Sequence, residues 1–458
     1  MCRDHDELDP LPTTVTRRGV IGGAMAVIGA GLAAAGLPAE AMAAGGGAST
    51  GGTGAARAAS GGSSGVGSPA AGRAGLGRPP VPGAVVVEGG TLLDPLTGQV
   101  VEDAVVVLDR GKVVASGNRS QTRAAAAAVQ GQVIDAGGRW ILPGLVDVHV
   151  HENAVADAHA ALVLGATTVR SGTSDFYQDI GLRALGPWAP GVVPRMRATG
   201  TFITPDLGTT IIGDPALAPL AGGVRTPQEL RYMTSVNLDR GVDWVKTRVN
   251  PRAGIPDQDP LVQVYDYEQI RAIVTEAGNR GVGVMCHSYS EKAIDDAVRA
   301  GIRTLEHGVF VGEQTLLRMA RQNTYFTPTM SAINGLKDSP NPILKQRGEQ
   351  FFPVLQAAVR RAAELGVNVV AGTDSFGLAV DPIGGEVRLL HEAGMSALDA
   401  IRAATTGAAR LLGLQNTVGR LARGYAADLI LVDSSPLDTP AVLEKPHLVI
   451  ANGTVVGG

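Results

Sequence analysis

The chain has 458 residues, of which 45% are hydrophobic and 18% are charged, and its formal net charge is −4 at pH 7. This composition is too apolar for a disordered protein, and the length suffices for a large core or for two to three domains. The near-neutral charge argues against a nucleic-acid binder, which normally carries a basic face. The two cysteines are too few for a disulfide framework.

Residues 1–43 have the layout of an export signal. Arg17-Arg18 opens a weakly apolar run that reaches Leu37, and Ala-Met-Ala at 41–43 is a cleavage-like site. The paired arginines resemble a twin-arginine signal, which a translocase reads as an address. A membrane anchor is the alternative, but the glycines of the run and Pro38 favour export. We therefore expect an exported protein with no stable membrane insertion after the signal is removed.

Residues 44–82 form a segment of low complexity. Of these 39 residues, 27 are Gly, Ala or Ser, and none is acidic. Such a stretch cannot bury enough apolar surface to offset the entropy lost on ordering. We predict a disordered linker between the export signal and the folded body.

The two ends of the folded body share a pattern of short β-rich runs broken by turns. These runs are 84–87, 104–108, 112–115 and 132–134 near its start, and 427–432 and 447–456 near its end. Asn452-Gly453 is a hairpin turn signal within the last run. We predict that residues 83–143 and 421–458 pair into one small composite β-sandwich domain.

Residues 144–420 alternate between apolar strands and amphipathic helices. The predicted strands include 166–169, 242–249, 282–287, 302–307, 324–328 and 367–372. The predicted helices include 229–238, 267–278, 293–300, 314–322 and 354–365. Parallel strands joined by helices over this length fit one (β/α)8 TIM barrel. The predicted fold class is therefore α/β, a TIM barrel with the small β-sandwich domain.

Six polar side chains lie at or near the carboxyl ends of the apolar strands, the face where barrel enzymes collect their catalytic groups. His149 and His151 end the first strand, and alternation along a strand puts both side chains on one face, where they can share a metal. Two hydrogen-bonded structural histidines are the alternative for this pair alone. A metal site is favoured because four of the eight histidines of the chain fall at this one end of the predicted barrel. The remaining members of the group are Lys246, His287, His307 and Asp374.

The order His-x-His, Lys, His, His, Asp resembles the amidohydrolase superfamily. Longer phrases are similar to its imidazolonepropionase-like and prolidase-like branch: Leu-Pro-Gly-Leu-Val-Asp-Val-His-Val-His at 142–151, Gly-Ala-Thr-Thr-Val-Arg at 165–170, Leu-Glu-His-Gly at 305–308, Gly-Thr-Asp at 372–374, Ala-Ala-Thr-Thr at 403–406 and Gly-Tyr-Ala-Ala-Asp-Leu at 424–429. The resemblance runs from about residue 84 to residue 458 and so covers the whole folded body.

In the binuclear members of this family, a carbamylated lysine bridges two divalent metals, usually zinc. An ammonium group cannot be a metal ligand, whereas a carbamate is an anion with two oxygens. Asp374 would be the catalytic residue, a general base that becomes a general acid. The resemblance implies two ligand sets with one bridge between them: His149, His151 and Asp374 for one metal, His287 and His307 for the other, and carbamylated Lys246 as the bridge.

Two further residues are candidates for binding the substrate. Prolidase-like relatives carry a tyrosine at the position of Tyr289, where it helps to hold the substrate. Arg248 lies two residues beyond Lys246, so it points to the same side of its strand and can pair with a substrate carboxylate. Packing at the rim is the alternative for both. Cys286, next to a ligand but on the opposite face, is predicted to be a buried structural thiol.

The chain departs from these relatives at two places near the predicted pocket. Ser171-Gly172 stands where the family usually has Asp after the arginine, and Thr-Arg-Val-Asn-Pro-Arg at 247–252 replaces a glycine-rich loop. We expect substrate selection in loops at 201–213 and 336–349. A family substrate therefore cannot simply be carried over.

The sequence predicts an exported, metal-dependent amidohydrolase that cleaves an amide-type C–N bond in a dipeptide, an N-acyl amino acid or a cyclic amide. If Lys246 is unmodified, the alternative is a mononuclear cyclic-amide hydrolase or deaminase. A non-catalytic secreted binding protein on the same barrel is less favoured, because every candidate ligand is present. The expected partner is a small-molecule substrate and no nucleic acid, and homo-oligomerisation stays open.

Overall fold

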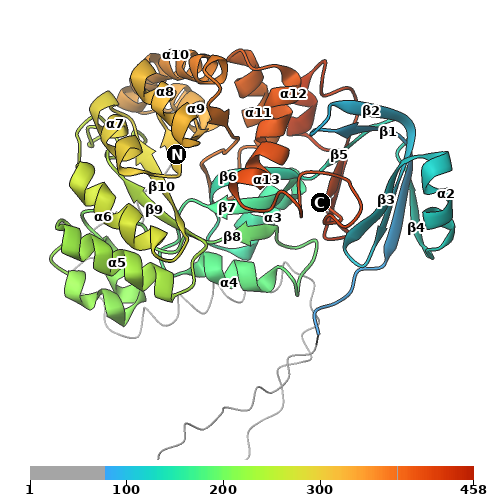
Figure 1. The fold of residues 1–458 in the computed structure, drawn as a ribbon, viewed down its shortest axis with the longest axis horizontal. Coiled ribbons are helices and arrows are strands. Elements are labelled where there is room, and N and C mark those ends of the chain that lie inside the picture. The colour runs from blue at the N-terminus through green and yellow to red at the C-terminus, as the bar shows by residue number, and fades with distance from the viewer. Residues whose placement is uncertain (1–77, 379, 458) are drawn as a thin grey trace, which may run out of the picture. The chain divides into compact units, whose positions relative to one another are not determined.

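The computed structural model describes residues 78–457 apart from residue 379 (Figure 1). The predicted export signal and nearly all of the predicted linker lie outside the described residues, so both stay predictions. None of the helices within the described range is long and apolar enough to cross a membrane.

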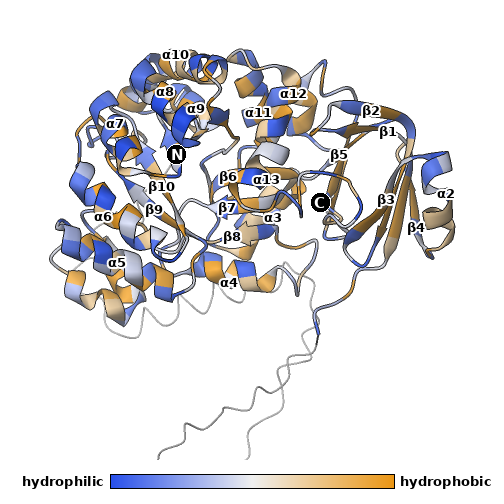
Figure 2. Ribbon diagram, in the orientation of Figure 1, coloured by the Kyte–Doolittle hydropathy of each residue, from blue (hydrophilic) through white to orange (hydrophobic). Residues whose placement is uncertain are grey.

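Strands from both ends of the folded body share one eight-stranded sheet. Its order is β17-β16-β15-β5-β1-β2-β3, and β4 pairs with β1. The junction is antiparallel, with Trp140 opposite Val432 and Pro143 opposite Leu429. Figure 2 shows strands of this sheet as mostly hydrophobic. The strands are β1 (Ala84–Asp94), β2 (Gln99–Asp109), β3 (Lys112–Asn118), β4 (Gly131–Asp135), β5 (Trp140–Pro143), β15 (Leu429–Val432), β16 (Leu448–Ala451) and β17 (Thr454–Val455).

The turn between β16 and β17 follows from its sequence. Asn452 and Gly453 have φ values of 49° and 79°, the left-handed pair that a two-residue hairpin needs. The predicted hairpin at 447–456 is confirmed.

One element of this region is missing from the sequence-based prediction. The helix α2 (Arg119–Ala127) is closed at its start by a capping box between Asn118 and Gln121.

The middle of the chain forms two parallel sheets. One has the order β14-β6-β7-β8 and the other β13-β12-β11-β10-β9. The first contains β14 (Ser375–Phe376), β6 (Leu145–His151), β7 (Ala166–Ser171) and β8 (Arg195–Arg197). The second contains β13 (Asn368–Val369), β12 (Tyr325–Thr327), β11 (Thr304–His307), β10 (Gly283–Ser288) and β9 (Trp244–Arg248).

Backbone hydrogen bonds connect the edges of these two sheets. Val148 N donates to Ala371 O at 3.1 Å, next to β13, and Ile203 N donates to Lys246 O at 3.0 Å, next to β9. The carboxyl ends of β6, β9, β10 and β11 therefore lie near one another, and Figure 1 shows helices outside these strands. The α/β class and the succession of parallel strands and helices are as predicted.

The helices match the predicted ones closely where their amphipathic pattern is clear. The predicted helix 267–278 is α6 with identical bounds. The helices of this region are α3 (Val155–Val163), α4 (Gln178–Leu185), α5 (Pro227–Asp239), α6 (Tyr267–Gly278), α7 (Glu291–Ala300), α8 (Glu313–Gln322), α9 (Met330–Gly335), α10 (Pro342–Glu364), α11 (Ile383–Glu392), α12 (Ala397–Ala403) and α13 (Thr406–Leu411).

The prediction for 336–349 is wrong, because most of this expected loop is helical. Helix α10 begins at Pro342, where the Asn341 side chain accepts hydrogen bonds from the first backbone amides. Pro353 lies inside the helix. A proline usually ends a helix, which is why the sequence favours a start only at 354.

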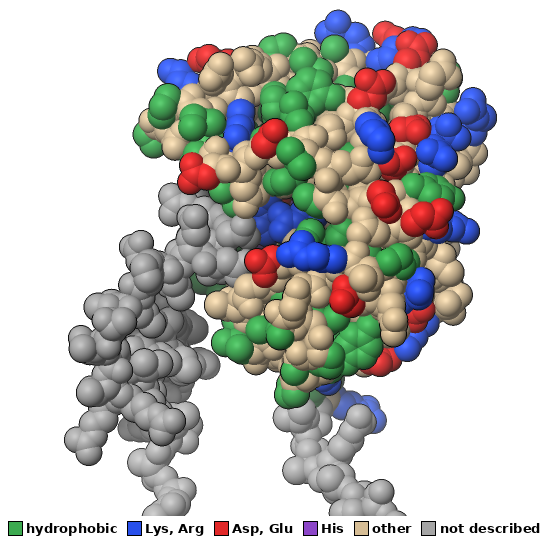
Figure 3. Space-filling model, turned by 90° about the vertical axis from the view of Figure 1, so that its left-hand side faces the viewer, with side chains coloured by type: hydrophobic (Ala, Val, Ile, Leu, Met, Phe, Trp, Pro, Cys, Tyr) green, Lys and Arg blue, Asp and Glu red, His purple; other side chains and the backbone are tan. Residues whose placement is uncertain are grey.

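The surface on the side drawn in Figure 3 carries interspersed basic and acidic side chains, and Lys and Arg side chains also lie in a hollow near its centre.

Candidate metal centre

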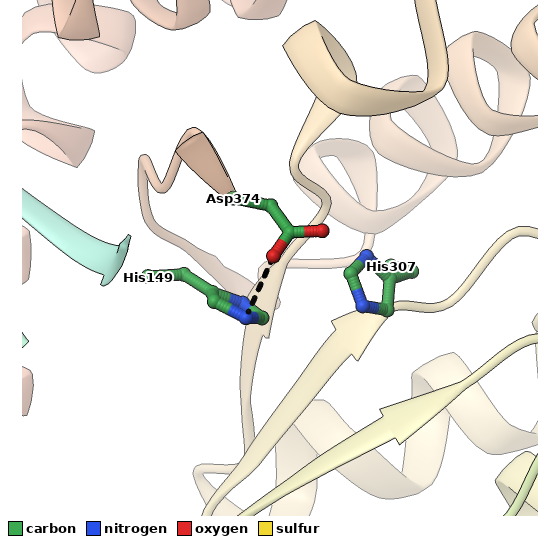
Figure 4. Close-up of side chains that lie close together, drawn as sticks. All are labelled: His149, His307 and Asp374. Atoms are coloured by element: carbon green, nitrogen blue, oxygen red, sulfur yellow. Dashed lines mark ion pairs between the residues drawn. The ribbon is translucent and has the colours of Figure 1, made fainter. Parts of the chain in front are cut away.

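Three predicted ligands meet in one buried cluster. His149 ends β6, His307 ends β11, and Asp374 follows β13 and leads into β14. One ligand atom from each lies within 4.8 Å of the other two, and all three residues are buried. Figure 4 shows the Asp374 carboxylate between the two imidazoles, and His149 Nε2 lies 3.3 Å from Asp374 Oδ1.

Two more of the predicted ligands contact this cluster directly. His151 Nε2 lies 3.0 Å from Asp374 Oδ1, so both histidines of the His-x-His pair face the same carboxylate. Lys246 is only 2% exposed, and its Nζ lies 2.8 Å from His149 Nε2. A buried lysine in the middle of β9 is a functional-site candidate and does not snorkel to the surface.

His287 lies next to the cluster through ring contacts. Its imidazole meets that of His307 edge-on, with the ring centroids 4.4 Å apart. Its Nε2 lies 3.1 Å from the carbonyl oxygen of Pro251. Tyr289 stacks on His307 at 5.2 Å with an interplanar angle of 19° and meets His287 edge-on at 4.8 Å. The structure thus brings Tyr289 against two of the predicted ligands, and its role in binding substrate stays a prediction.

Arg248 is half-buried at the end of β9. Its guanidinium donates a hydrogen bond to Thr204 Oγ1 and lies over the ring of Phe202, with 5.0 Å between the guanidinium carbon and the ring centroid. Lys246 Nζ lies 5.9 Å from the same ring. The two cationic side chains therefore share one side of β9, as strand alternation predicts.

The donor atoms of the cluster suit a divalent cation. Burial lowers the pKa of His149 to about 4 and that of His307 to about 3, so both imidazoles are neutral and have a lone pair to donate. Burial alone would raise the pKa of Asp374, but its contacts with His149 and His151 outweigh this effect and hold it well below its usual value. His307 Nε2 is buried and has no hydrogen-bond partner. A bound cation would satisfy this orphaned atom.

Sequence reasoning missed the group that orients His149. Glu306 Oε2 lies 2.8 Å from His149 Nδ1, and its other oxygen pairs with Arg170 Nη2 at 3.1 Å. Arg170 also donates to Val148 O and lies over the Trp244 ring, and both members of the ion pair are fully buried. The carboxylate fixes the tautomer that carries the proton on Nδ1, which leaves Nε2 free to act as a ligand. A charged residue inside an apolar strand was the only sequence signal for this role.

A second set of contacts positions His307. Its Nδ1 lies 2.6 Å from Thr329 Oγ1, in the residue before α9. The buried carboxylate of Glu386, on α11, accepts hydrogen bonds from Met330 N and Ser331 N at 2.8 Å each and so anchors the start of α9. Like Asp374, His307 and Thr329 have positive φ. Such backbone strain costs on the order of 1–3 kcal/mol per residue and typically accompanies functional sites.

Cys286, His159 and His391 are not members of this cluster. Cys286 is fully buried in the core, and burial raises the pKa of its thiol to about 12, as expected for a structural thiol. His159 and His391 contact backbone carbonyl oxygens of Val192 and Met395.

Gly172 leaves no room for a side chain beside the two β6 histidines. A Cβ at this position would lie 2.7 Å from His151 Nε2 and 2.8 Å from His149 Cδ2. We expect Gly172→Ala to displace these imidazoles and to lower metal content and activity at least tenfold, since disturbing the groups that orient metal ligands typically costs about 10–100-fold. Gly181→Ala in α4 is the matched control, because a Cβ there meets nothing within 4 Å. Metal analysis of both variants checks this, and full metal content in Gly172→Ala would contradict it.

The fold and the site together define an α/β metal-binding hydrolase. The profile of the amidohydrolase family matches residues 140–456, and the chain belongs to this family of hydrolases that act on C–N bonds. An uncharacterised protein of Mycobacterium tuberculosis is 28% identical over 341 residues, which cover 70% of this chain and 86% of the relative. Ochratoxinase of Aspergillus niger is 27% identical over 236 residues, 50% of this chain and 48% of that enzyme. The crystal structure of a putative prolidase from Bifidobacterium longum is 25% identical with a TM-score of 0.71, covering 83% of this chain and 96% of that one.

Proposed function

We propose that the protein hydrolyses an amide-type C–N bond of a small molecule, such as a dipeptide, an N-acyl amino acid or a cyclic amide. The buried cluster of His149, His307 and Asp374 is the observation that carries this proposal. Similarity to ochratoxinase and to a putative prolidase supports it, and so does membership of a family of hydrolases that act on C–N bonds.

The proposed centre holds two divalent ions, with zinc as the first candidate, on a closed (β/α)8 barrel. Bound divalent ions polarise a carbonyl oxygen and lower the pKa of water. The proposal rests on the neutral imidazoles, the orphaned His307 Nε2 and the position of Lys246 beside His149. We assign His149, His151 and Asp374 to one ion, His287 and His307 to the other, and carbamylated Lys246 to the bridge.

The side chains of the protein move the protons and hold the substrate. Asp374, ionised and next to the ligand histidines, accepts a proton from the attacking water and returns it to the leaving nitrogen. Tyr289 bounds the substrate on the side of His287 and His307. Arg248 binds a carboxylate of the substrate, because its guanidinium is fixed by Thr204 on the same side of β9 as Lys246.

Removal of the metal should abolish turnover. We expect metal-loaded protein to hydrolyse members of a panel of dipeptides and N-acyl amino acids, and chelator-treated protein to lose at least 99% of that rate. Adding Zn²⁺ back should restore the rate, because no protein side chain can replace the Lewis acid. Ninhydrin detection of released amine measures the rate, with chelator removed before the assay as a control. An unchanged rate in protein shown to be metal-free would contradict the proposed function.

A further inference from the structure

Three cationic side chains converge on one aromatic ring beside the candidate metal centre. Phe202 follows β8, and its side chain is buried. The guanidinium carbons of Arg248 and Arg252 lie 5.0 Å and 5.5 Å from the centroid of its ring, and Lys246 Nζ lies 5.9 Å away. A cation over the face of an aromatic ring is attracted by the quadrupole of the ring, and this attraction helps to hold the three side chains near Phe202.

Arg252 belongs to the segment that replaces a glycine-rich loop after β9. This segment is tied to the ligand histidine His287, whose Nε2 contacts Pro251 O and whose backbone oxygen accepts a hydrogen bond from Val249 N at 3.0 Å. Asn250 Oδ1 accepts a hydrogen bond from Tyr289 N at 2.8 Å. The segment that carries Arg252 is therefore held against His287 and Tyr289.

Arg347 of α10 holds the chain that follows this segment in place. Its guanidinium donates hydrogen bonds to four backbone carbonyl oxygens, at distances between 2.6 Å and 3.1 Å, and thereby fixes the chain that follows Arg252. The acceptors are Ala253, Ile255, Pro256 and Gln258. Arg248 is fixed separately by Thr204. The guanidinium of Arg248 and the backbone next to Arg252 are thus fixed by different parts of the fold, which lowers the entropy cost of binding a ligand between them.

We propose that Arg248 and Arg252 form a seat for two carboxylates, so that the enzyme prefers amides whose C-terminal residue is Asp or Glu. This inference rests on the proposed function. Arg248 binds the α-carboxylate of the C-terminal residue, as in the proposed function, and Arg252 binds the carboxylate of its acidic side chain. The guanidinium groups of Arg248 and Arg252 both lie over the ring of Phe202, so the two carboxylates of one small acidic residue can each meet a guanidinium.

Paired substrates that differ only in charge test the seat. Ala-Glu and Ala-Gln have nearly the same shape, and we expect kcat/KM to be about tenfold or more higher for Ala-Glu, since a charge-assisted hydrogen bond is worth that factor. Arg252→Met should reduce this ratio to near one, and Arg252→Lys should keep part of it. Arg321→Met, an exposed arginine of α8, is the control and should keep the full ratio. Equal rates for the two dipeptides in the wild type, or an unchanged ratio in Arg252→Met, would overturn the inference.

A binding measurement separates this inference from the proposed function. Calorimetric titration with N-acetyl-glutamate and N-acetyl-glutamine needs no turnover. If no amide is hydrolysed but N-acetyl-glutamate binds about tenfold more tightly through Arg252, the proposed function fails and the carboxylate seat stands. If both ligands bind equally, the seat is overturned whatever the rate of hydrolysis.

Discussion

Asp374→Asn should lower kcat/KM by about three orders of magnitude, because removal of a general acid–base group typically costs about 10²–10⁴-fold. Asp374 Oδ1 lies 3.0 Å from His151 Nε2 and 3.3 Å from His149 Nε2, and an amide in its place can neither accept nor return the proton. Asparagine also tolerates the positive φ of 58° at this position, so the backbone stays in place. Steady-state kinetics on the assigned substrate measures the loss.

The control for this experiment is Asp438→Asn, a change of an exposed aspartate far along the chain. Circular dichroism and the thermal unfolding midpoint should show that both variants are folded. More than a tenth of the wild-type activity in folded Asp374→Asn would contradict the assigned role.

Glu306→Gln should produce the largest loss of stability. The substitution removes the negative charge that faces Arg170 and leaves an uncompensated guanidinium in a fully buried position. Breaking one side of a buried ion pair costs about 3–5 kcal/mol of unfolding free energy. Urea denaturation measures this free energy, with Glu313→Gln at the exposed pair with Arg361 as the matched control, expected to cost at most about 1 kcal/mol.

The same variant separates the two roles of Glu306. Its contact with His149 Nδ1 fixes the ligand tautomer, so metal affinity should fall about 10–100-fold as well. The double variant Arg170→Met, Glu306→Met should recover stability, because it leaves no unpaired buried charge, but should not recover metal affinity. If Glu306→Gln has the same free energy of unfolding as the wild type, the ion pair between Arg170 and Glu306 does not stabilise the fold, and the prediction is wrong.

Local patterns predicted most of the fold. The amphipathic period of 267–278 gave the bounds of α6, and the Asn452-Gly453 signal gave the last hairpin. The start of α10 was missed because Pro353 lies inside a helix whose start depends on the Asn341 cap and on packing. Helix α2 was missed because its alanine-rich run carries little periodicity, and its capping box decides its start.

Local sequence patterns likewise predicted only part of the candidate site. Strand alternation predicts that His149 shares one side of its strand with His151, and Arg248 shares one side with Lys246, as the structure shows. The roles of Glu306 and Arg347 depend on partners that the sequence cannot identify. Glu306 lies 136 positions from Arg170, and Arg347 binds carbonyl oxygens about 90 positions away. Which side chains meet across such distances is decided only when neighbouring strands and helices pack together.

Metal stoichiometry tests the central claim most directly. Wild-type protein and Lys246→Ala, both produced with zinc and bicarbonate, should be compared by elemental analysis with the exposed Lys292→Ala as control. The proposed centre predicts about two metal ions per chain in the wild type and in Lys292→Ala, with a sharp fall in Lys246→Ala. One ion per chain regardless of Lys246 would instead favour a mononuclear cyclic-amide hydrolase or deaminase, and no bound metal in any of the three proteins would contradict the account.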